Sequence, residues 1–142
     1  MNIKVMYHTT TGNTRKISQA IASAVGVQAE LIEKNTSFEM PVDLLFIGDG
    51  LYGGKAHKST IAFIDQLSPA TVKNAAVFGT YGGQPIIVNY IKKLLQDKGI
   101  NVIDGQFGCK GKAWFFINRK HPDETDLNMA QEFAKRTMEK LT

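Results

Sequence analysis

The chain has 142 residues and a net charge of +4, with 43% hydrophobic and 21% charged residues and a sequence pI near 9.2. This length predicts one domain over residues 1–142, and no apolar run approaches the roughly 20 residues that a membrane-crossing helix needs. The basic residues are spread along the chain, which does not favour nucleic-acid binding. We therefore expect a globular protein without membrane insertion.

The N-terminus and the cysteine content predict a cytoplasmic protein. Residues 1–5 lack the apolar core and the cleavage site of a secretory signal, and they lead directly into a predicted strand. The single cysteine, Cys109, excludes an intrachain disulfide and a cysteine-cluster metal site. We expect no metal centre.

The first half of the chain alternates predicted strands and helices. Ile3–Tyr7 is a short apolar run, and apolar residues at helical spacing follow it until Gly26. Residues 27–32 predict a second strand. Residues 42–48 predict a third, whose nearly unbroken apolar run is typical of a strand covered on both faces. Because only about nine residues join these two strands, the second crossover helix should be reduced to about one turn.

The second half continues this alternation. Ile61, Ile64 and Leu67 predict a helix that ends near Pro69, and residues 75–79 predict a fourth strand. A helix opened by Pro85 and ended by Gly99 follows, then a fifth strand over residues 100–107 and a last helix over residues 127–141. The pattern predicts an α/β fold with a parallel sheet between two helical layers.

Three loops lie where ligands bind in such sheets, beyond the carboxyl ends of the strands: residues 9–14, 49–57 and 80–84. The first loop offers threonine hydroxyls, the Asn13 amide and backbone N–H groups at a helix N-terminus. These donors suit an anion with several oxygens, above all a phosphate. Helix capping by Thr11 or Asn13 would explain one such residue and not five.

The sequence Thr-x-Thr-Gly-Asn-Thr at residues 9–14, after an apolar strand ending in Tyr7, resembles the FMN-phosphate loop of flavodoxins. The sequence FGTYGG at residues 78–83 resembles the flavin-ring loop of that family. The resemblance covers essentially the whole chain. It implies a flavodoxin-like three-layer sandwich with strand order 2-1-3-4-5 and FMN as the cofactor.

By this resemblance, the second and third loops would hold the isoalloxazine ring between them. Tyr52 and Tyr81 are stacking candidates, with Leu51 as an aliphatic alternative, and neighbouring glycines would let backbone groups reach the ring's polar edge. The expected cofactor-binding residues are Thr9, Thr10, Thr11, Gly12, Asn13, Thr14, Leu51, Tyr52, Gly53, Gly54, Thr80, Tyr81, Gly82 and Gly83.

Two features depart from the usual flavodoxin. Many members have a tryptophan where this chain has Gly83, so one face of the flavin would be more open here. The chain is also basic, whereas flavodoxins are typically acidic. The basic side chains suspected of raising the flavin's low reduction potential are Lys55, His57, Lys110 and Lys112.

The resemblance implies a small FMN electron carrier that shuttles electrons between a reductase and an acceptor protein. The alternative is an FMN-dependent NAD(P)H or quinone-type reductase, in which Gly83 leaves room for a substrate and His57 donates a proton. A nucleotide triphosphatase is disfavoured because Asp49 and Ala56 break the phosphate-loop pattern around Gly54 and Lys55.

Overall fold

The computed structural model of the chain describes residues 1–9, 12–33, 35–50, 54–79, 84–103 and 124–141. Within them, five strands form one parallel sheet in the order β2-β1-β3-β4-β5. The strands are β1 (Ile3–Tyr7), β2 (Ala29–Leu31), β3 (Val42–Asp49), β4 (Val72–Gly79) and β5 (Asn101–Val102). The predicted fold class and strand order are confirmed.

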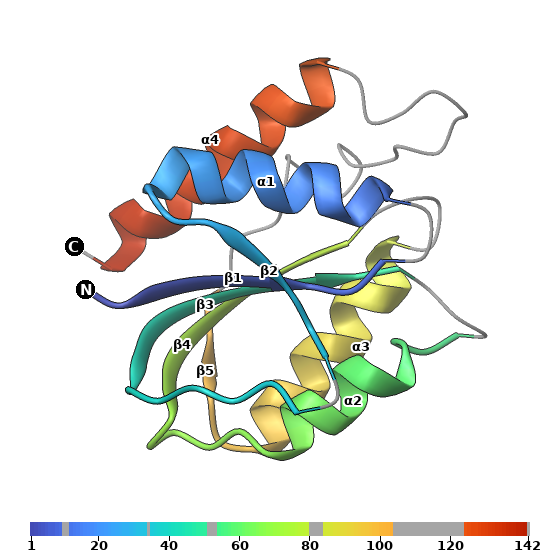
Figure 1. Cartoon of the computed structure of the whole chain (residues 1–142), viewed down its shortest axis with the longest axis vertical. Coiled ribbons are helices and arrows are strands. Elements are labelled where there is room, and N and C mark those ends of the chain that lie inside the picture. The colour runs from blue at the N-terminus through green and yellow to red at the C-terminus, as the bar shows by residue number, and fades with distance from the viewer. Residues whose placement is uncertain (10–11, 34, 51–53, 80–83, 104–123, 142) are drawn as a thin grey trace.

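Helices cover both faces of the sheet, as Figure 1 shows. On one face lie α1 (Asn13–Val25) and α4 (Glu124–Leu141), which pack against each other. On the other face lie α2 (Lys58–Asp65) and α3 (Gln84–Asp97). This arrangement is the three-layer sandwich that the strand and helix alternation predicts.

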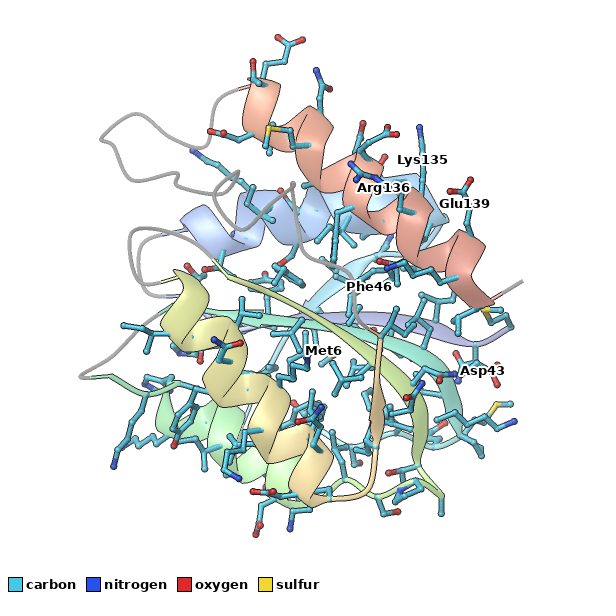
Figure 2. All side chains as sticks on the ribbon, turned by 180° about the vertical axis from the view of Figure 1, so that it is seen from behind. Met6, Asp43, Phe46, Lys135, Arg136 and Glu139 are labelled. Atoms are coloured by element: carbon cyan, nitrogen blue, oxygen red, sulfur yellow. The ribbon has the colours of Figure 1, made fainter. Side chains whose placement is uncertain are left out.

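Strand β3 forms the centre of both cores because its neighbouring residues face opposite sides. Leu45 and Ile47 belong to the apolar cluster beneath α2 and α3, whereas Phe46 belongs to the cluster beneath α1 and α4. The Phe46 ring meets Phe133 of α4 edge to face, with 5.8 Å between ring centroids. Figure 2 shows Phe46 and Met6 on opposite sides of the sheet. The unbroken apolar run of this strand is therefore explained by burial on two faces.

The sequence analysis predicts strand β2 too long and strand β4 too short. The N–H group of Val27 bonds the carbonyl of Ala22 at 3.0 Å, so Val27 completes the end of α1 and does not open a strand. Among the described strands, β2 pairs with β1 alone, and it is exposed at Leu31. Strand β4 begins three residues earlier than predicted, because Val72 pairs with Val42. The polar residues Lys73 and Asn74 follow Val72 and hide the start of the strand in the sequence pattern.

Three further segments can be compared with the sequence prediction. The described residues of the 33–41 segment form a turn, closed by Glu33 and Thr36, and contain no helical residue. Helix α2 ends at Asp65, although Leu67 is still buried in the core through a tight turn after it. Strand β5 is short, and residues 104–107 of the predicted fifth strand lie outside the described residues, as do Cys109, Lys110 and Lys112.

Candidate functional site

The three predicted loops start from one edge of the sheet. Strands β1, β3 and β4 are neighbours, and Tyr7 pairs with Gly48 while Asp49 pairs with Gly79. The chain leaves β1 toward β2 and then returns to β3 on the other side of β1, so the order of the sheet reverses at this point. Open α/β sheets bind ligands at the carboxyl edge beside such a reversal. The topology thus places the candidate site between the ends of β1 and β3.

The described residues include only part of the predicted site. In the first loop (residues 9–14) they include Thr9, Gly12, Asn13 and Thr14, and in the second loop (residues 49–57) they include Gly54. The predicted site residues outside the described part of the chain are Thr10, Thr11, Leu51, Tyr52, Gly53, Thr80, Tyr81, Gly82 and Gly83. Gly54 is exposed and has a positive φ of 83°.

The first loop folds back on itself before α1 begins. The N–H group of Gly12 donates a hydrogen bond to Thr9 Oγ1 at 2.9 Å, and the carbonyl of Gly12 accepts from the N–H of Lys16 at 3.2 Å. Gly12 is the N-cap of α1 with φ 91° and ψ −7°, a left-handed conformation that glycine adopts without strain. Thr9 therefore fixes the turn through its side chain, and Gly12 supplies the backbone geometry.

The N-terminus of α1 has the properties of an anion-binding site. Its N-cap residue, Gly12, makes no side-chain capping hydrogen bond, and its first turn contains no acidic residue. The first N–H groups of a helix have no intrahelical partner, and the helix dipole places partial positive charge there. Thr14 is 2% exposed at this end, and the nearby Arg15 and Lys16 are exposed. Of the two caps considered from sequence, Asn13 is already a residue of the helix and Thr11 is outside the described residues.

A second group of polar residues lies at the same edge, and it joins the first loop to the second. Asp49, the last residue of β3, is completely buried. Its Oδ1 lies 3.1 Å from Nδ1 of His8 and accepts from the N–H of Gly50 at 2.7 Å. Its Oδ2 accepts from the N–H of His57 at 2.8 Å. Three donors thus surround one carboxylate, which compensates its removal from water.

The imidazole rings of His8 and His57 stack beside this carboxylate, with 3.8 Å between centroids and 13° between planes. His57 is also the N-cap of α2, where its Nδ1 accepts a hydrogen bond from the N–H of Ser59 at 3.1 Å. Burial is the main cause that lowers the pKa of His57, followed by His8 and then Lys58, while Asp49 opposes them. The neutral ring is therefore favoured, with its proton on Nε2.

The sequence analysis assigned no role to His8, and it did not include Asp49 among the binding residues. A signal was present, because an aspartate at the end of a strand that is otherwise buried on both faces must have donors to its carboxylate. The two histidines lie 49 positions apart in the numbering, and only the pairing of β1 with β3 brings them together. His57 was considered as a proton donor, and the structure shows its Nδ1 already engaged as a helix cap.

Comparison with known proteins defines the class of this protein. Residues 4–117 match the model of the flavodoxin domain family, so the chain belongs to that family. Over 135 residues it is 36% identical to an uncharacterized protein of Methanocaldococcus jannaschii, covering 87% of this chain and 88% of that one.

Two solved structures have the same fold. A flavodoxin from the domain Archaea superposes with a TM-score of 0.78 at 19% identity, covering 99% of each chain. A Fusobacterium nucleatum flavodoxin bound to flavin mononucleotide superposes with a TM-score of 0.68 at 12% identity, and this match also covers 99% of each chain. No helix in the described part of the chain has the length and apolar character needed to cross a membrane.

Proposed function

We propose that the chain binds FMN at the carboxyl edge of its sheet and acts as a single-domain electron carrier. The observation that carries this proposal is the N-terminus of α1, where the N-cap Gly12 has a left-handed conformation and makes no side-chain capping hydrogen bond, and where the first turn contains no acidic residue. A phosphate monoester supplies several acceptor oxygens and two negative charges, which suit these donors and the helix dipole. The position of this turn at the sheet's order reversal supports the same ligand.

Within this proposal, the first loop binds the phosphate through Thr9, Thr10, Thr11, Gly12, Asn13 and Thr14. The flavin ring lies between the second loop and residues 80–83. The stacking candidates are Leu51, Tyr52 and Tyr81. Backbone groups are brought to the ring edge by Gly53, Gly54, Thr80, Gly82 and Gly83. Bound FMN supplies the electron-transfer chemistry. The protein contributes binding, orientation and electrostatics.

The charges near the site support a carrier whose partner proteins differ from those of an acidic flavodoxin. Lys55 and Lys58 are exposed beside the second loop, and Arg15 and Lys16 are exposed beside the first. Each positive charge about 10 Å from the ring favours an added electron by roughly 0.4 kcal/mol in water. Because these exposed side chains are positively charged, the expected partners are a cytoplasmic reductase and an acceptor protein with acidic docking surfaces. The described residues contain no specific observation that favours the reductase alternative.

Two glycines give a matched test of the phosphate assignment. Gly12 and Gly26 flank α1 with φ values of 91° and 77°, and a Cβ on either would meet no atom within 4 Å. Alanine at either position should therefore cost a similar amount of stability, about 1 kcal/mol of backbone strain. Only Gly12→Ala should also weaken FMN binding, because it distorts the turn that presents the N–H groups.

The measurement is titration of each apo-variant with FMN, followed by flavin fluorescence, together with urea unfolding. We expect about tenfold weaker FMN binding for Gly12→Ala and unchanged binding for Gly26→Ala, since tenfold corresponds to about one lost hydrogen bond. Equal FMN affinity in the two variants would argue against phosphate binding at the N-terminus of α1.

A further inference from the structure

Strand β2 lies at one edge of the sheet and pairs on one side only, with β1, among the described strands (Figure 1). On that side, the N–H group of Ile32 donates to the carbonyl of Tyr7 at 2.7 Å. Successive residues of a strand point their backbone groups to opposite sides, so those of Ala29 and Leu31 face away from β1. A row of such groups at a sheet edge is a template for a further strand.

A hollow lies beside β2 on each face of the sheet. The hollow on the face covered by α1 measures about 410 Å³ and is lined by Gln19, Ala22, Ser23, Val27, Gln28 and Ala29. The hollow on the other face measures about 300 Å³ and is lined by Asn2, Lys4, Glu30 and residues 36–40. The described residues of the 33–41 connection include no helical residue that would cover β2 there. The side chains of an added strand alternate between the two faces, so they would enter both hollows.

The sequence of this edge is complementary to itself in one antiparallel register. When Ala29 of one copy lies opposite Ala29 of a second copy, each N–H group donates to the other carbonyl. Leu31, which is 44% exposed, then lies opposite Val27 of the second copy. Glu30 lies opposite Gln28 of the second copy, whose amide is a donor to the carboxylate. This register therefore pairs apolar side chains with each other and gives each carboxylate a partner.

The adjacent register, in which Ala29 lies opposite Leu31, is unfavourable. It places the two Glu30 side chains directly opposite each other in a non-hydrogen-bonded pair, where Cα atoms are about 4.5 Å apart. Like charges at such positions destabilise a sheet. Lys4 lies 3.5 Å from Glu30, but an exposed ion pair of this kind offsets little of the repulsion. Charge thus selects the register centred on Ala29.

We propose that the free edge of β2 is a self-association surface, on which a second copy of this chain pairs antiparallel around Ala29. The contact is two-fold symmetric, because the same strand is used by both copies. The two sheets join into one, backbone hydrogen bonds supply affinity, and side chains in the flanking hollows supply specificity. The contact leaves the carboxyl ends of β1 and β3 open, so the inference goes beyond the proposed function and does not depend on it.

Sedimentation equilibrium of the purified protein tests the association. The concentrations run from about 10 µM to 1 mM, because a small interface lies at the weak end of specific complexes. We expect a reversible equilibrium between monomer and dimer. Leu31→Lys should weaken the dimer at least about tenfold, because it places a charge against Val27 of the second copy. Ile86→Lys is the matched control, since Ile86 is a 56% exposed residue of α3, and it should leave the dimer unchanged.

Cysteine substitutions identify the register in a Cys109→Ser background. Ala29→Cys should form an intermolecular disulfide on oxidation, because the Cα atoms of a hydrogen-bonded pair lie about 5.5 Å apart. Leu31→Cys is the control, since Leu31 is more exposed than Ala29. Its two copies would lie about 14 Å apart along the strands, too far for a disulfide. A mixture of Leu31→Cys and Val27→Cys should again form one, because these residues lie opposite each other.

Three results would overturn the proposal. The first is a protein that stays monomeric at every concentration. The second is an association that Leu31→Lys does not weaken, because the copies would then meet through another surface. The third is a disulfide in Leu31→Cys without one in Ala29→Cys, which would exclude the register. Flavin binding is not measured in these experiments, so the self-association surface and the proposed function fail separately.

Discussion

Replacing Gly48 by alanine is expected to lower the free energy of unfolding by about 3 kcal/mol, the upper part of the range for overpacked cores. Gly48 lies in β3 directly beside Phe78 of β4, which is its register partner. A Cβ at this position would lie closer than 3.0 Å to three atoms of the Phe78 ring. Phe78 is completely buried beneath α1 and α4, so the ring has no exposed direction in which to move.

Urea unfolding of the apoprotein measures this effect, and a second substitution identifies its cause. Phe78→Leu should by itself reduce stability through lost packing, yet combined with Gly48→Ala it should cost less than the sum of the two changes. Additive costs, or a stable Gly48→Ala variant, would contradict the packing that we describe between these strands. The glycine would then have to be explained by the neighbouring candidate site.

Replacing Thr14 by valine should weaken FMN binding about 10- to 100-fold while changing riboflavin binding little. Thr14 is 2% exposed at the start of α1, and valine has nearly the same shape without the hydroxyl. A hydrogen bond to a charged group contributes about 1.5 to 3 kcal/mol, which corresponds to this range of affinity. Riboflavin lacks the phosphate, so it does not use this interaction in the proposed site.

Thr137→Val provides the control for a buried threonine in a helix. Thr137 is also 2% exposed, and its hydroxyl donates to the carbonyl of Phe133 at 2.8 Å in α4. Its loss should reduce stability slightly and leave both flavin affinities unchanged. Titration of both variants with FMN and with riboflavin measures these affinities. An equal loss of FMN and riboflavin in Thr14→Val would count against a phosphate at this turn.

The sequence predicts the central elements of the fold well because their burial leaves a strong pattern. Strand β3 is apolar on both faces, and Gly26 ends α1 as expected, in a left-handed conformation. The bounds of a strand are predicted less well where they depend on strand pairing or on hydrogen bonds of an adjacent helix. Val72 joins β4 only because it pairs with Val42, and β2 is shortened because Val27 completes the hydrogen bonds of α1.

The candidate site shows the same division between local and long-range information. The first loop is recognisable because its threonines, glycine and asparagine are consecutive in the sequence. The junction of His8, Asp49 and His57 is not recognisable, since these residues follow β1, end β3 and cap α2, and they meet only in the folded sheet. Its chemistry depends on burial of Asp49, which a sequence pattern indicates only indirectly.

The most direct test of the proposed electron carrier is the visible spectrum of the protein, purified without added cofactor and reduced stepwise without oxygen, in the presence and absence of NADPH. We expect a bound flavin that accumulates its one-electron-reduced form during the titration and is not reduced by NADPH. Rapid reduction by NADPH with turnover would contradict the carrier and favour the reductase. A colourless protein that also fails to bind added FMN would contradict the flavin site itself.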